Sequence, residues 1–89
     1  MLEELRKRID KIDDEMARLF TERLAVTEEI ALVKKEKNLP VQNSRRESDI
    51  IDRLAKGHED ELSEYITILF TAIFEISRAQ QSKIIGSES

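Results

Sequence analysis

The residues with the clearest potential for chemistry are two cations, Arg23 and Lys34, near an apolar seam in the first part of the chain. Arg23 follows Leu19 at the next position of that seam. Burying a cation there costs free energy unless an anion pairs with it. Lys34 comes 11 residues later, about 20° away around a helix and about 16 Å along it. The two cations therefore share one face and can bracket a small anion. The seam alternates three- and four-residue spacings, as a packed helix requires, through Leu5, Ile9, Ile12, Met16 and Leu19.

Each of the two cations also has a purely structural interpretation. Arg23 is suited to set helix register, or to form an internal ion pair with Glu22 or Glu29. Lys34 belongs to "KKEK" at a helix end, which is typical of a solvated cationic turn favoured by the helix dipole. Their shared face, rather than either residue alone, favours a binding role.

A carboxylate, Glu47, lies on the apolar face of a shorter helix, four residues before Ile51. Ser44 and Glu47 also form S-x-x-E, a capping box that begins helices, so this carboxylate either caps the helix or faces inward. Arg46 is adjacent, and either residue is suited to face inward. If Asn43 is the N-cap instead, Glu47 is too far along to complete the box and is free for a ligand.

A polar pair continues the apolar stripe of the last helix. Ile66, Phe70 and Ile73 are followed by Ser77 and then Gln81, which are four residues apart and therefore on one face. The pair either marks the end of the core or adds a hydroxyl and a neutral amide donor to a site.

The inward-facing polar residues form a set without a nucleophile. The chain has no cysteine, no Gly-rich phosphate loop and no metal-ligand spacing. His58, the only histidine, stands in "GHEDE", which is typical of a solvated loop. Arginines, a lysine, one carboxylate and an amide suit a small dicarboxylate, and a reaction that needs positioning and electrostatic stabilisation rather than covalent chemistry.

Three helices must position these residues. Helical periodicity predicts them over residues 2–37, 44–56 and 60–85, separated by Pro40 and by Gly57, which is suited to cap the second. The sequence therefore predicts an all-α fold with a long, a short and a long helix.

Composition supports one domain over residues 1–89. No run of about 18 apolar residues is present, so we expect no membrane span. The net charge of -4 and the lack of a basic tail argue against nucleic-acid binding. The charged opening "MLEELRKRID" does not resemble a signal peptide, so a cytoplasmic location is the default expectation.

The length of the first helix predicts a dimer. Thirty-six residues span about 54 Å, whereas a compact chain of this size has a radius of gyration of about 12 Å. A second copy must therefore bury the seam, either in an intertwined homodimer or in a plain coiled coil without a site. Arg6 lies 17 residues before Arg23, about 25 Å away and about 100° off its face. It joins Arg23 only across an antiparallel dimer.

Four segments together resemble the all-helical class of chorismate mutase along nearly the full chain. They are "LRKRIDKID", "ERLAVTEEIALVKKEK", "PVQNSRRESDIIDRL" and "YITILFTAIFEISRAQQ". The resemblance implies a dimer of three-helix chains that rearranges chorismate, a dianion, to prephenate on the path to phenylalanine and tyrosine, with no cofactor.

The resemblance also implies residue roles. Arg23 and, from the other subunit, Arg6 clamp substrate carboxylates. Lys34 reaches a carboxylate and the ether oxygen, and Gln81 donates to the same ether oxygen. The catalytic residues it implies are Lys34, Gln81 and Arg23.

The remaining implied residues bind the substrate. Glu47 accepts from the ring hydroxyl with Arg46 beside it, and Ser77 lies near the ring carboxylate. Asn43 stands where some family members have Asp, and the hydrogen bond expected there comes largely from the backbone. Substrate binding is thus carried over to Arg6, Asn43, Arg46, Glu47 and Ser77.

Two other functions are compatible with the same fold. Isochorismate-pyruvate lyase shares much of the cationic set, although a carboxylate at Glu47 matches the mutase better. A regulatory or interaction module, with a mutase-like fold and no turnover, is the second alternative.

Overall fold

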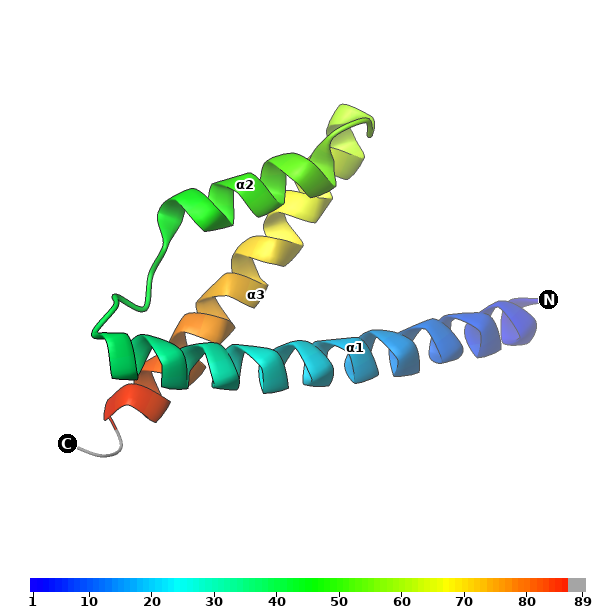
Figure 1. Ribbon diagram of the computed structural model, residues 1–89. Helices are drawn as coiled ribbons and strands as arrows, with labels where there is room; N and C mark the ends of the chain where they lie inside the picture. The colour runs from blue at the N-terminus through cyan, green and yellow to red at the C-terminus, as the bar shows by residue number, and fades with distance from the viewer. Residues whose placement is uncertain (87–89) are drawn as a thin grey trace.

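Three helices make up the computed structural model, which describes residues 1–86 (Figure 1). Helix α1 runs over Leu2–Lys37, α2 over Ser44–Ala55 and α3 over Asp60–Gly86, with no strand among these residues. The predicted all-α architecture of a long, a short and a long helix is confirmed. Helix α2 ends one residue earlier than predicted, and α3 continues one residue further.

Helix α1 ends at a left-handed residue, Asn38, with φ 57° and ψ 42°. The N–H of Leu39 donates to the carbonyl of Lys34 at 2.8 Å, and the N–H of Asn38 to that of Lys35 at 3.3 Å. These paired bonds form the Schellman motif, and asparagine tolerates the left-handed conformation better than most residues. Pro40 follows and has no N–H with which to continue a helix.

The turn between α2 and α3 depends on Gly57, which has a φ of 83°. Lys56 leaves the helical region with ψ 134°, which is why α2 ends before it. Ser63 Oγ donates to the carbonyl of Ala55 at 3.0 Å, so a side chain of α3 satisfies one of the last carbonyls of α2. Gly57 therefore forms the turn, while Lys56, and not Gly57 as expected, is the C-cap of α2.

Helix α3 is the common support, because α1 and α2 both pack against it and not against each other. Thr27 Oγ1 of α1 donates to Gln80 Oε1 of α3 at 2.7 Å. Gln80 Nε2 in turn donates to the carbonyl of Leu24 at 3.0 Å. This polar contact fixes the crossing of α1 and α3 beside the most deeply buried residues, which are Thr27, Ala31, Ile50, Phe74, Ser77 and Gln81.

The N-terminal half of α1 extends away from the other helices (Figure 1). The chain measures 54 Å along its longest axis and 14 Å along its shortest. The apolar seam is between 49% and 53% exposed at Leu5, Ile9, Ile12, Met16 and Leu19. A single chain thus leaves this seam in solvent, so its burial by a second copy stays a prediction.

Within residues 1–86, no helix is both long and apolar enough to cross a bilayer.

Candidate active site

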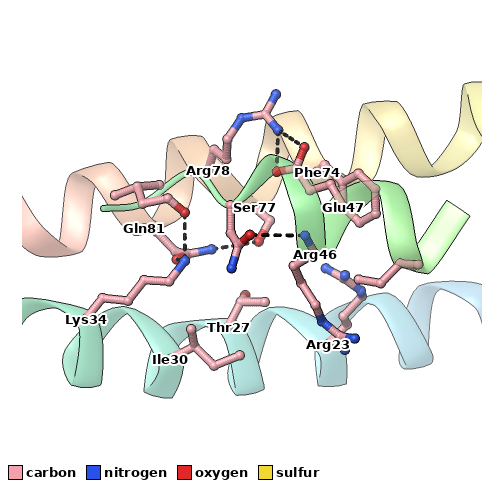
Figure 2. A pocket seen from close by; sticks show the side chains of 13 residues that line it. Arg23, Thr27, Ile30, Lys34, Arg46, Glu47, Phe74, Ser77, Arg78 and Gln81 are labelled. Carbon is pink, nitrogen blue, oxygen red and sulfur yellow. Dashed lines mark hydrogen bonds and ion pairs between the residues drawn. The ribbon is translucent and has the colours of Figure 1, made fainter. Parts of the chain in front are cut away.

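A cavity of about 310 Å³ lies where the three helices meet. Seven of the eight predicted site residues line it, namely Arg23, Lys34, Asn43, Arg46, Glu47, Ser77 and Gln81. Arg6 does not, because it is exposed on the extended half of α1. Figure 2 shows Arg23 and Arg46 toward one end of the cavity and Lys34 and Gln81 toward the other.

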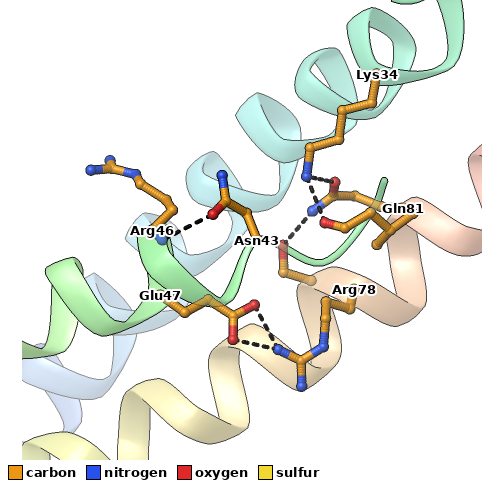
Figure 3. Close-up of polar contacts among 8 residues, drawn as sticks. Lys34, Asn43, Arg46, Glu47, Arg78 and Gln81 are labelled. Atoms are coloured by element: carbon orange, nitrogen blue, oxygen red, sulfur yellow. Dashed lines mark hydrogen bonds and ion pairs between the residues drawn. The ribbon is translucent and has the colours of Figure 1, made fainter. Parts of the chain in front are cut away.

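Lys34 and Gln81 are joined by a hydrogen bond at one end of this cavity (Figure 3). Lys34 Nζ donates to Gln81 Oε1 at 3.0 Å and to the carbonyl of Val41 at 2.7 Å. Gln81 Nε2 donates to Ser77 Oγ at 3.1 Å. An ammonium has three donors and an amide nitrogen has two. Within the part of the chain that the structure describes, each group therefore keeps one N–H for a ligand, in an orientation that its other bonds fix.

Arg23 carries positive charge into the opposite end of the cavity. Its guanidinium carbon lies 5.7 Å from the ring centroid of Phe74, within the range of a cation–π contact. Burial lowers the pKa of the Arg23 guanidinium, and the charge of Arg46 lowers it further. Its Nη1 is buried and has no hydrogen-bond partner among the described residues. Arginine stays charged at neutral pH even so, which leaves a donor suited to an anion.

Asn43, and not Ser44, caps α2. Its side-chain oxygen accepts from the N–H of Arg46 at 3.0 Å. The carboxylate of Glu47 is consequently not used in a capping box, and both of its oxygens accept from Arg78 Nη1, at 2.7 and 2.6 Å. The choice that the sequence left open between two caps is thus decided in favour of Asn43.

Charge complementarity defines what the cavity can hold. The described residues that line it include four cations and a single carboxylate, which are Arg23, Lys34, Arg46, Arg78 and Glu47. Residues 1–86 contain no group of three or more His, Cys, Asp or Glu side chains able to hold a metal ion. Such a lining favours a small molecule with two negative charges.

The sequence was compared with known protein families and proteins. Residues 5–82 match the family described as chorismate mutase type II.

The chain belongs to the chorismate mutase type II family.

A chorismate mutase of Methanocaldococcus jannaschii is 33% identical over 86 residues, which cover 94% of this chain and 87% of that protein. A bifunctional chorismate mutase/prephenate dehydratase of Aquifex aeolicus is 40% identical over 59 residues, covering 66% of this chain and 16% of that protein. No solved structure matches the chain significantly. Membership of the chorismate mutase family makes the chain an enzyme of the isomerase class.

Sequence reasoning missed Arg78, which is the partner of Glu47. The sequence does contain one signal for it, since Arg78 is the only lysine or arginine between Lys56 and Lys83. Periodicity did not reveal it, since a residue next to Ser77 is turned about 100° away from the polar face of α3. The carbonyl of Val41 was missed too, because a backbone acceptor leaves no mark in a sequence.

We predict that Asn43→Ala lowers the free energy of unfolding by about 1 kcal/mol, because the N–H of Arg46 loses its acceptor. Asn43→Asp and Asn43→Ser should retain most of the stability. Urea unfolding at one fixed protein concentration measures the difference. Gln42→Ala, an exposed neighbour that makes no cap, is the control, and equal stability of Asn43→Ala and wild type would contradict the assignment.

Proposed function

We propose that the cavity between α1, α2 and α3 binds chorismate and catalyses its rearrangement to prephenate. The observation that carries this proposal is the hydrogen-bonded pair of Lys34 and Gln81 at the end of the cavity away from Arg23, each with one N–H that no described residue uses. Two donors in a fixed orientation suit the ether oxygen of the substrate, and separate cations suit its carboxylates.

The arginines hold the dianion in its reactive conformer. Arg23 offers a buried N–H that has no hydrogen-bond partner within residues 1–86, and Arg46 stands near enough to lower the pKa of Arg23 through its charge. Two like charges this close are relieved by an anion between or beside them. Binding both carboxylates of a folded substrate reduces the entropy lost on reaching the transition state.

Lys34 and Gln81 act on the transition state itself. As the carbon–oxygen bond breaks, negative charge collects on the ether oxygen, and only interactions that strengthen there accelerate the reaction. Lys34 supplies charge and Gln81 a neutral amide, and neither needs to reorient because Val41 and Ser77 already hold them. Glu47 accepts from the ring hydroxyl, Ser77 lies beside the ring carboxylate, and the Asn43 backbone contributes a polar contact.

A second copy completes the site in this proposal. The exposed seam of α1 pairs with its equivalent in an antiparallel homodimer, which buries apolar surface that a single chain leaves in water. Arg6 lies on the extended half of α1, about 25 Å along the helix from Arg23. Such pairing brings the Arg6 of one subunit to the cavity of the other.

The direct test follows chorismate consumption by ultraviolet absorbance and identifies prephenate as product. We expect turnover by wild type, and a loss of about 10²–10³-fold in kcat for Lys34→Ala, which removes one of the two donors. Lys35→Ala, at a neighbouring residue that does not line the cavity, is the matched control. No turnover at micromolar wild-type protein contradicts the proposal.

Gln81→Glu should make activity depend on pH. The introduced carboxyl donates only while protonated, and once ionised it pairs with Lys34 and withdraws that donor as well. Activity should therefore fall as pH rises through the pKa of the new carboxyl group. The wild-type pH profile should lack this fall, because the amide of Gln81 does not titrate. Gln42→Glu, outside the cavity, should show the wild-type profile, whereas an unchanged profile for Gln81→Glu argues against the donor role.

Mixing two inactive variants tests the role of Arg6 across the dimer. Arg6→Ala and Arg23→Ala chains that exchange subunits form heterodimers with one intact site, so about a quarter of all sites should recover under random pairing. Arg23→Ala mixed with Lys34→Ala is the control, because both residues would serve the same site and no heterodimer is intact. If verified exchange restores no activity, Arg6 does not act in trans.

A further inference from the structure

Arg78 of α3 holds the only carboxylate among the described residues that line the cavity. Its Nη1 lies 2.7 Å from Oε1 and 2.6 Å from Oε2 of Glu47 on α2 (Figure 3). The two side chains are 28% and 23% exposed, so the pair is largely withdrawn from water. A charge-assisted hydrogen bond in such surroundings is less screened by water than an exposed surface pair, and it is therefore stronger.

Packing alone does not fix the carboxylate of Glu47. Glu47 and Arg78 also line a second cavity, of about 180 Å³, between α2 and α3. Space therefore lies on both sides of the pair, toward Arg23 and Lys34 in the larger cavity and toward Thr71 in the smaller one. In such surroundings the hydrogen bonds to Arg78 set the direction of the carboxylate.

The ion pair also keeps the carboxylate from the other cations of the cavity. Arg23 has a buried nitrogen without a hydrogen-bond partner among the described residues, and it bears the repulsion of Arg46. A free Glu47 carboxylate would be drawn to these two guanidinium groups. There it would neutralise the charge on which a substrate carboxylate depends.

Binding to Arg78 leaves the carboxylate able to accept another hydrogen bond. A carboxylate has about four acceptor positions on its two oxygens. Arg78 uses one on each oxygen. As far as residues 1–86 are concerned, one position on each oxygen therefore remains, so Glu47 can accept from a hydroxyl without releasing Arg78.

We propose that Arg78 is a positioning residue, which holds the Glu47 carboxylate against α3 as a fixed acceptor and keeps it from neutralising Arg23 and Arg46. This rests on the proposed function, in which Glu47 accepts from the ring hydroxyl of chorismate. Arg78 itself acts through Glu47 and does not touch the reacting atoms.

Kinetics of a double-mutant cycle test the proposal. Arg78→Met, which keeps an unbranched apolar stem but removes the charge and the donors, should lower kcat/KM for chorismate by about 10-fold, with part of the loss in KM because the arginines become neutralised. Arg78→Lys should retain more activity than Arg78→Met. On a Glu47→Gln background, which has no carboxylate charge to hold, Arg78→Met should change kcat/KM by less than about 2-fold.

Two controls separate positioning from folding and from bulk charge. Circular dichroism and urea unfolding establish that each variant is folded. Arg45→Gln removes the same charge from an exposed position that lines neither cavity, and it should keep wild-type kinetics. Equal losses from Arg78→Met on both backgrounds, or no loss on either, would overturn the proposal.

A crystal structure of Arg78→Met gives a readout that does not depend on turnover. The Glu47 carboxylate should move to within about 4 Å of the guanidinium of Arg46 or Arg23. A carboxylate that keeps its wild-type position overturns the positioning role, whatever the activity of the chain. Failure of wild type to convert chorismate, by contrast, contradicts the proposed function and leaves this structural outcome to decide about Arg78.

Discussion

Unbalanced positive charge at the junction of the three helices is the constraint on which the rest of the structure depends. Among the described residues, four cations and one carboxylate line a cavity beside the most deeply buried side chains. Withdrawing cations from water costs free energy unless an anion offsets it, and the buried residues at the junction are as often polar as apolar. The free energy that holds the cations together must therefore come from elsewhere. Burial of the apolar seam of α1 could supply that free energy, because the seam lies in solvent in the single chain.

The hydrogen-bonded polar residues show how an all-helical fold can hold N–H donors in fixed orientations. Asn38 ends α1 three residues before the Val41 carbonyl, and the short connection brings that carbonyl back to Lys34. One N–H of Lys34 is thereby used by the backbone and another by Gln81, so the direction of the third is determined. Stabilisation of a developing charge is strongest when donors need no reorganisation. A pericyclic rearrangement requires no nucleophile, which explains why long side chains on rigid helices suffice.

Helical periodicity predicted which residues of this site share a helix face, but it did not predict the hydrogen bonds between them. The 11-residue interval between Arg23 and Lys34 fixes their shared face in any regular helix, and the four-residue interval between Ser77 and Gln81 does the same on α3. What periodicity does not encode is the partner that each side chain selects across helices. Glu47 had a local partner in the S-x-x-E pattern, yet it bonds with Arg78, 31 residues away. That outcome depends on the packing of α2 on α3, which no local pattern specifies.

In the proposed dimer, helix α1 would serve assembly through its extended N-terminal half and chemistry through its C-terminal half. Its seam carries Leu5, Ile12 and Leu19, whereas Arg23 and Lys34 face the cavity near its C-terminal end. Because an 89-residue chain this extended buries few side chains completely, its own core gives limited stability. A second copy that covers the seam would stabilise the same helix that holds the cations. In such a dimer, substitutions in the seam would weaken the site even where they lie far from it, because they would destabilise the helix that carries Arg23 and Lys34.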